Sequence, residues 1–236
     1  MLDRAGVQPG AKLLDVGCGD GRLAKAAINR DLSVTACDPD PGMRALTTAT
    51  THGNAVVLDA GLPELDGIGD STFDAAVANF VINHLSDPRA ALRGLRRVLH
   101  RGGRIVFTIW TEIAAPHVQA LGEALDRVGA PPAAGLRLPP DLDFPRTPEG
   151  MGGIARTAGL CVDSVEEITW TWQVAPDSLW TGFLAGIGSR SERFAAQSPA
   201  TQTRVRELVT KALSSDLDEG VYWLPCTAGL CVAHRA

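Results

Sequence analysis

Short apolar runs alternate with segments of helical periodicity along the first half of the chain. The runs are typical of strands covered on both faces, and the segments between them carry apolar residues three or four positions apart. This alternation predicts an α/β fold with a doubly wound, mostly parallel sheet. Strands are predicted at residues 13–16, 33–38, 55–60, 71–79 and 104–110, and the clearest helices at 22–29 and 88–99, the second ended by Gly102-Gly103.

The pattern changes after Trp110, where longer amphipathic segments follow one another. Residues 129–145 are rich in proline and glycine and are expected to form a long loop. Further helices are predicted at 116–128, 147–158, 178–187 and 201–213, and further strands at 162–174 and 222–233.

A glycine-rich corner follows the first predicted strand, with Gly17, Gly19 and Gly21 at every second position. Glycine is needed where the backbone takes unusual dihedrals or where a ligand approaches the main chain, although a plain turn also uses it. Arg22 stands where a dinucleotide fingerprint has its third glycine, which disfavours a nicotinamide-dependent reductase. Asp38 ends the second predicted strand, about 20 residues past the first glycine, where a carboxylate can hold ribose hydroxyls.

With this corner and Asp38, the chain resembles the class I S-adenosylmethionine-dependent methyltransferases. The resemblance implies S-adenosylmethionine as the cofactor, with Asp38 on its ribose and Met43 against the adenine, although Met43 is equally well a core residue. Asp59 would accept a hydrogen bond from the adenine amino group, while a carboxylate after a strand is also a common helix N-cap. The expected cofactor-binding residues are Asp15, Gly17, Cys18, Gly19, Gly21, Asp38, Pro39, Met43, Asp59, Ala60, Asn79 and Phe80.

A second match runs from Phe73-Asp74 to His84-Leu85-Ser86-Asp87. It resembles small-molecule methyltransferases of the ubiquinone-biosynthesis type. The resemblance implies that the Asn79 carbonyl meets the amino group of the methionine moiety and that Phe80 lines the sulfonium. Asn79-Phe80-Val81-Ile82 stands where nucleic-acid and amino-group methyltransferases carry Asn/Asp-Pro-Pro-Tyr, which disfavours those acceptors.

His84 is the candidate catalytic base because it lies inside this second motif. A base is useful only if the acceptor must lose a proton, and a packed histidine satisfied by the backbone is the alternative for His84. His117 is a weaker candidate. Aromatic residues that could surround an apolar small-molecule acceptor, or belong to the core instead, are Trp110, Phe144, Trp180 and Phe183.

The resemblance also implies a Rossmann-like arrangement with an antiparallel last strand and a helical cap. The expected domains are residues 1–110 as the cofactor-binding core, 111–158 as a helical cap, and 159–236 as strands that complete the sheet, with helices that add to the cap.

Composition narrows the class of protein. A net charge of −5 and an isoelectric point near 5.5 predict no general attraction to nucleic acid or to anionic membranes. The arginines of residues 93–104 are expected to be a solvated helix face. No apolar run approaches the roughly 20 residues that span a bilayer. Five cysteines without Cys-x-x-Cys spacing predict reduced thiols in a cytoplasmic protein, and no metal site is expected.

The sequence therefore predicts methyl transfer from S-adenosylmethionine to a small-molecule acceptor, with natural-product metabolism as one setting. The alternative is a related protein that binds the cofactor but catalyses cyclisation or rearrangement. A non-catalytic partner protein is disfavoured by the intact glycine corner and its two acidic residues. The acceptor, the atom that is methylated and the oligomeric state are left open.

Overall fold

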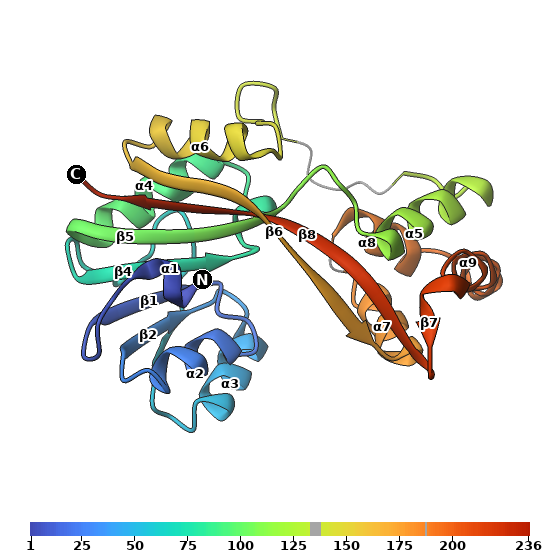
Figure 1. Cartoon of the computed structure of the whole chain (residues 1–236), viewed down its shortest axis with the longest axis horizontal. Coiled ribbons are helices and arrows are strands. Elements are labelled where there is room, and N and C mark those ends of the chain that lie inside the picture. Colours follow the sequence, from blue (N-terminus) through green and yellow to red (C-terminus); the bar gives the residue numbers. More distant parts are fainter. Residues whose placement is uncertain (133–137, 187) are drawn as a thin grey trace. The chain divides into compact units, whose positions relative to one another are not determined.

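Five parallel strands form the sheet that the apolar runs predict. In the computed structural model, which describes residues 1–132, 138–186 and 188–236, they are β1 (Lys12–Val16), β2 (Ser33–Cys37), β3 (Val56–Leu58), β4 (Phe73–Asn79) and β5 (Leu99–Trp110). The sheet order is β3-β2-β1-β4-β5-β8-β6 (Figure 1). Residues 228–234 of β8 (Val221–His234) pair antiparallel with residues 104–110 of β5. The expected mostly parallel sheet with an antiparallel last strand is confirmed.

Helices cover both faces of this sheet because successive side chains of a strand point to opposite sides. Leu14 and Val16 share one buried cluster with Leu92 and Leu95 of α4 (Pro88–Val98), whereas Leu13 is fully buried outside that cluster. Helix α2 (Arg22–Ile28) packs on β1 and β2, and α3 (Pro41–Thr50) packs on β3. Burying a leucine side chain contributes about 1.5–3 kcal/mol, so these strands are the stable frame of the site.

The chain divides into two compact units. The first consists of Met1–Glu112, Leu138–Glu167 and Ala228–Ala236, and the second of Ile113–Arg137 and Ile168–Thr227. This division differs from the sequence-based one. Helix α6 (Pro148–Thr157) was expected in a cap of residues 111–158, but it packs on α4 and belongs to the first unit. The boundary also falls inside β6 (Cys161–Val174) and β8 rather than before them.

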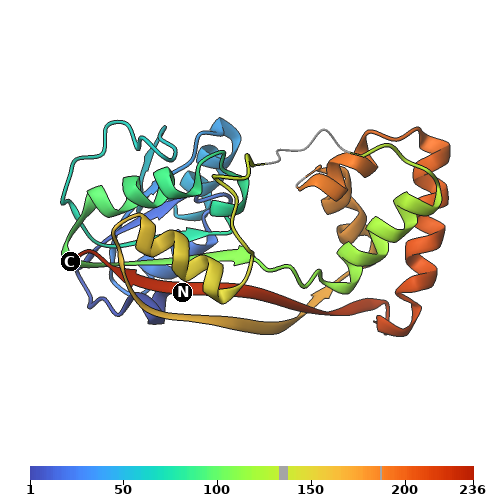
Figure 2. The ribbon, with the colours of Figure 1, turned by 90° about the horizontal axis from the view of Figure 1, so that it is seen from above.

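The second unit is mainly helical (Figure 2). Its helices are α5 (Pro116–Arg127), α7 (Pro176–Leu184), α8 (Ser189–Ala195) and α9 (Pro199–Ala212). They bury a cluster that includes Leu121, Trp180, Phe183, Phe194 and Tyr222. The expected helix 178–187 is α7, shifted toward the N-terminus, and α8 was not predicted. Residues 133–137 of the expected loop, and residue 187 of that helix, lie outside the described residues.

Short elements complete the structure: α1 (Leu2–Ala5), η1 (Ile82–His84), η2 (Ser214–Asp216) and β7 (Leu217–Asp218). Proline occupies the first turn of α3, α4, α5, α6, α7 and α9. Its fixed φ suits that position, and the missing N–H would have no partner inside the helix.

One expected helix end is wrong. Gly102-Gly103 does not close the helix of residues 88–99, because α4 ends at Val98 and the chain enters β5 at once. Phe73 pairs with Leu99 and Ala75 with Arg104, so residues 100–103 bulge out of the β4–β5 ladder. Gly102 has φ +78 there, and its N–H donates to the Arg235 carbonyl at 2.7 Å.

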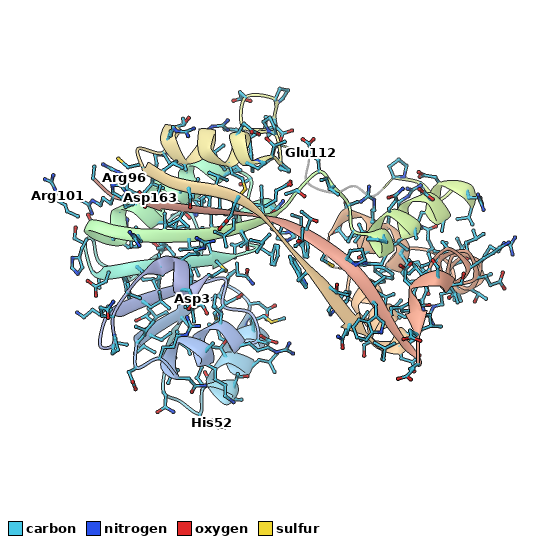
Figure 3. The ribbon with its side chains drawn as sticks, viewed as in Figure 1. Asp3, His52, Arg96, Arg101, Glu112 and Asp163 are labelled. Carbon is cyan, nitrogen blue, oxygen red and sulfur yellow. The ribbon has the colours of Figure 1, made fainter. Side chains whose placement is uncertain are left out.

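Of the arginines expected on a solvated face, Arg93, Arg101 and Arg104 are exposed, whereas Arg96 and Arg97 are half-buried. Arg96 Nε donates to the Gly159 carbonyl at 2.9 Å. Asp163 of β6 pairs with His234 at 2.7 Å. Figure 3 labels Arg96, Arg101 and Asp163 near the start of β5, and Glu112 beyond its end. Arg96 and Arg101 therefore lie near the start of β5, whereas the glycine corner follows the carboxyl end of the parallel strand β1.

All five cysteines are free thiols, and four of them are buried. Cys161 is exposed at the start of β6. Among the described residues, no helix combines the length and apolar character needed to cross a membrane.

Candidate active site

The glycine corner after β1 uses all three glycines, for different reasons. Gly17, Gly19 and Gly21 have φ of +63, +55 and +79, in the left-handed region that other residues rarely adopt. A Cβ on Gly17 would meet Val81 Cγ2 at 2.5 Å, and one on Gly21 would meet Thr47 Cα at 2.7 Å. A Cβ on Gly19 would have no described atom within 4 Å. Gly17 and Gly21 therefore serve packing, whereas the space beside Gly19 is open.

Backbone and side-chain hydrogen bonds hold this corner against the end of β2. Gly17 and Cys18 both donate their N–H to the Cys37 carbonyl, at 2.8 and 3.1 Å. Thr47 Oγ1 lies 2.9 Å from the Gly19 carbonyl and 3.2 Å from Cys18 Sγ. Burial raises the pKa of the Cys18 thiol, so it stays protonated here.

Asp38 joins the end of β2 to the glycine corner. Its Oδ2 accepts the Gly19 N–H at 3.1 Å and its Oδ1 accepts the Asp40 N–H at 2.9 Å, and the residue is buried. A carboxylate oxygen accepts more than one hydrogen bond. Asp38 therefore keeps acceptor capacity toward a ligand above the corner.

Asp15 lies inside β1, is almost fully buried, and has no described hydrogen-bond partner for Oδ2. Burial raises the pKa of Asp15 to about 7, with a smaller contribution from the charge of Asp38 and opposition from the Ala24 backbone N–H. A buried polar atom left unpaired costs about 1–3 kcal/mol, so it calls for an explanation. A ligand cation beside the corner would supply one.

The chain after β3 brings a second carboxylate to the same edge of the sheet. Asp59 is mostly exposed and pairs with Arg44 of α3 through two N···O distances of 3.0 Å. Ala60 beside it is buried.

Met43 is exposed, so the core alternative for this residue is wrong, and its backbone N–H donates to Asp40 Oδ1 at 2.9 Å. Pro39 accepts from Arg44 through its carbonyl.

The end of β4 is held in an unusual backbone conformation. Phe80 has φ +58, and its N–H donates to Thr108 Oγ1 of β5 at 3.0 Å. Thr108 Oγ1 donates in turn to Asn79 Oδ1 at 2.8 Å. The Phe80 ring stacks on Trp110, with centroids 4.2 Å apart and an interplanar angle of 14°. Such strain costs about 1–3 kcal/mol and is typical of functional sites.

Comparison with known proteins identifies this arrangement. Residues 14–107 match a family model described as a methyltransferase domain. This part of the chain is a methyltransferase domain. The resemblance to the class I S-adenosylmethionine-dependent methyltransferases is thereby confirmed.

Two curated relatives agree with the domain. The chain is 34% identical over 128 residues to a malonyl-(acyl-carrier protein) O-methyltransferase of Serratia marcescens, covering 54% of this chain and 48% of that protein. It is 32% identical over 104 residues to a ubiquinone biosynthesis O-methyltransferase of Xanthomonas oryzae pv. oryzae, covering 42% of this chain and 43% of that protein. The chain thus spans about half the length of the curated relatives it matches.

A solved structure shares the fold over the whole chain. The YcgJ protein of Bacillus subtilis superposes with a TM-score of 0.61 at 17% identity, over 100% of this chain and 97% of that one. At this identity the likeness concerns the fold alone.

His84 lies in η1, shortly after the end of β4 in the methyltransferase domain, and it is exposed. The packed alternative for His84 is therefore wrong. His117, the weaker candidate, is buried in the second unit with no described partner for Nδ1. Its ring faces Trp172 and Phe183 at 5.3 and 6.1 Å, and burial lowers the pKa of His117 to about 4.

The four aromatic residues expected around an acceptor have different surroundings. Phe144 belongs to the core of the first unit, and Trp180 and Phe183 pack edge to face at 5.4 Å in the core of the second. Trp110 alone of the four is exposed, at the carboxyl edge of the methyltransferase domain's sheet. Its backbone N–H donates to Asn83 Oδ1 at 3.0 Å, which fixes the strand end under Phe80.

Sequence reasoning missed Arg44 and Thr108. Thr108 carries a signal, since it is a hydroxyl inside the apolar run of β5. Arg44 shows none, because its partners lie on segments separated along the chain. The described residues contain no group of three or more His, Cys, Asp or Glu side chains placed to hold a metal ion.

Proposed function

We propose that this protein binds S-adenosylmethionine at the carboxyl edge of the sheet and transfers its methyl group to a small-molecule acceptor. The observation that carries the proposal is the open glycine corner together with the unpaired Oδ2 of Asp15, in the strand that leads into it. A cationic amino acid moiety there would satisfy the buried carboxylate. The cofactor, when bound, supplies a methyl group on a positively charged sulfur.

In this proposal, different residues at the carboxyl edge of the sheet bind different parts of the cofactor. Asp15 and the Asn79 carbonyl face the ammonium group, and Asp38 accepts from the ribose hydroxyls. Asp59 accepts a hydrogen bond from the adenine amino group and the Ala60 N–H faces the adenine ring. Met43 and Pro39 lie against that ring. Gly17, Cys18, Gly19 and Gly21 let the main chain approach closely. The stacked Phe80 and Trp110 rings present aromatic surface to the sulfonium, since cations are attracted to such faces.

Alignment is the main contribution of the protein to the chemistry. With the cofactor held there, a bond from the acceptor atom to the methyl carbon would form as the carbon–sulfur bond breaks, and the electron pair would leave with sulfur. Orientation of two reactants contributes about 7–11 kcal/mol to lowering such a barrier. If the acceptor is a hydroxyl or an ammonium, its proton must leave, and we assign this task to His84, the exposed last residue of η1.

The acceptor side of the proposal is broader. Trp110 favours a flat or apolar small molecule, and we extend the proposal to acceptors of natural-product metabolism. The acidic net charge favours neither nucleic acid nor anionic membranes as partners. The free cysteines favour the cytoplasm as the place of action.

Calorimetric titration of the full chain with S-adenosylhomocysteine tests the cofactor site, and one-to-one binding is expected. Incubation with S-adenosylmethionine and a panel of phenols, carboxylates and amines, followed by mass spectrometry, tests transfer. A product heavier by one methyl group supports methylation. A product of unchanged mass with the cofactor unconsumed supports the cyclase alternative instead. If calorimetric titrations with S-adenosylhomocysteine and with S-adenosylmethionine both show no heat of binding, the proposal is wrong.

A further inference from the structure

Arg44 bridges the two chain segments that the proposed function assigns to the ribose and to the base. Its Nη1 lies 2.9 Å from the Asp38 carbonyl oxygen and 2.8 Å from the Pro39 carbonyl oxygen, just after β2. The same guanidinium meets Asp59, after β3, through Nη1–Oδ1 and Nη2–Oδ2 distances of 3.0 Å. Arg44 therefore fixes the position of Asp59 relative to the end of β2.

The helix gives no reason for an arginine at this position. Arg44 lies in the first turn of α3, whose capping residue is Asp40. The positive end of the helix dipole lies there, so a cation is disfavoured by a few tenths of a kcal/mol or more. The contacts of the guanidinium are with carbonyls and a carboxylate outside α3. Its role therefore concerns those groups rather than the helix.

Asp59 needs an external group to fix its orientation. Its side chain is 72% exposed, whereas that of Arg44 is only 21% exposed. A paired guanidinium fixes the plane of a carboxylate, because two parallel hydrogen bonds allow one geometry only. Each Asp59 oxygen uses one lone pair on Arg44 and retains another. The retained lone pairs are held in a fixed direction and can accept from an amino group.

We propose that Arg44 is a positioning residue that orients Asp59 so that its carboxylate accepts a hydrogen bond from the exocyclic amino group of the cofactor's base. The inference rests on the proposed function. It adds that Arg44 sets the preference of the site for an adenine over a base that carries a carbonyl at the same position. A carbonyl there would place two acceptors against each other, which leaves both without a partner.

Two ligands that differ only in this group test the proposal. S-adenosylhomocysteine and S-inosylhomocysteine are titrated calorimetrically into the wild-type chain, and the ratio of the two dissociation constants is the readout. One charge-assisted hydrogen bond is worth about tenfold or more in affinity, so the wild type is expected to prefer the adenosyl compound by about that factor. Arg44→Leu is expected to reduce the ratio to about threefold or less, and Arg44→Lys to an intermediate value.

Arg97→Leu is the matched control. Arg97 holds Asp70 at 2.5 Å and donates to the Ile68 and Glu64 carbonyls, which precede the first residue of β4, whereas Arg44 and Asp59 follow the ends of β2 and β3. The Asp70 side chain is 71% exposed and that of Asp59 is 72% exposed. Loss of the Arg97–Asp70 contact is expected to lower the free energy of unfolding and to leave the ratio of the two dissociation constants unchanged. In an Asp59→Asn background, Arg44→Lys is expected to change the ratio no further, because the two residues act as one unit.

The outcomes separate this inference from the proposed function. If neither compound binds the wild type, the proposed function fails. If both bind with equal affinity, or if Arg44→Lys and Arg44→Leu weaken both by one factor, the positioning role is wrong and Arg44 only supports the fold. A variant that binds the adenosyl compound more tightly than the wild type would show that Arg44 obstructs Asp59 rather than orienting it. Should Arg44→Leu fail to fold, the Arg44→Lys ratio decides.

Discussion

Gly19 in the glycine corner and Asp15 in β1 are single residues whose features favour ligand binding rather than stability of the fold. Gly19 takes a left-handed conformation with open space where a Cβ would point, and Asp15 has a buried oxygen without a described partner. Neither feature helps the folded chain by itself. Both are therefore expected to be costs that a bound ligand offsets.

At Gly19, substitution by alanine is expected to separate the two effects. Gly19→Ala forces a Cβ into a left-handed backbone, which costs about 1 kcal/mol of unfolding free energy. Gly10 has φ +85 and equally open surroundings in the turn before β1, so Gly10→Ala is the control with a similar cost. Only Gly19→Ala is expected to weaken S-adenosylhomocysteine binding, by tenfold or more. Equal affinities of the two variants would remove Gly19 from the site.

At Asp15, the raised pKa predicts a pH-dependent cost. The unfolded carboxyl loses its proton near pH 3.8 while the folded one keeps it to about pH 7. The unfolding free energy therefore falls as pH rises through this window, by up to about 4 kcal/mol. Asp15→Asn is expected to remove that fall, as urea titrations at several pH values would show, and to weaken cofactor binding at pH 8. An unchanged difference between variant and wild type across the window would contradict the pKa.

Strand β5 matters at the scale of elements because it organises the end of β4. Thr108 accepts the Phe80 N–H and donates to Asn79, and Trp110 lies under the Phe80 ring. The left-handed backbone conformation of Phe80 is thus held by two residues of β5, Thr108 and Trp110. The geometry of the β4 end depends on β5 rather than on its own sequence.

Removal of the Thr108 hydroxyl tests this dependence. Thr108→Val keeps the shape but leaves the Phe80 N–H without its acceptor, and a loss of about 1–3 kcal/mol in unfolding free energy is expected. Thr203→Val is the control, since that hydroxyl donates to the Pro199 carbonyl on the surface of α9 and its loss is expected to cost less than about 0.5 kcal/mol. Chemical denaturation measures both. Equal costs would mean that the Phe80 conformation is held by other contacts.

Element boundaries also show what the sequence could and could not predict. Apolar runs located β1, β2 and β4 because both faces of these strands are covered, and helical periodicity located α4 and α9 because each buries one face. Gly102-Gly103 misled the prediction, since a glycine pair suits a helix end and a strand bulge equally. The glycine corner and Asp38 were found from spacing, whereas Arg44 acts on Asp59 across 15 positions of chain, which no local pattern encodes.

At the scale of the whole molecule, two buried groups act on stability with opposite signs. His117 has a folded pKa of about 4, so the unfolded state binds a proton below pH 6.5 that the folded state does not. The unfolding free energy therefore rises with pH between about 4 and 6.5. Asp15 acts in the other direction over much the same window. The two contributions partly cancel in the wild type.

Replacement of His117 is expected to expose the Asp15 contribution. His117→Phe keeps the aromatic contacts with Trp172 and Phe183 and removes the titrating ring. Its stability relative to wild type is expected to increase on acidification from pH 6.5 to 4, by up to about 3 kcal/mol. His100→Gln, at an exposed position of β5, is the control. Parallel pH profiles of His117→Phe and wild type would show that the ring is not buried in its neutral form.

The distribution of thiols has a practical consequence. Burial raises the pKa of Cys18, Cys37, Cys226 and Cys231, which keeps them protonated and slow to react. Cys161 is exposed. A maleimide dye should consequently label the native chain once, at the first residue of β6, without any prior mutagenesis, and so give solution spectroscopy a reporter beside the sheet.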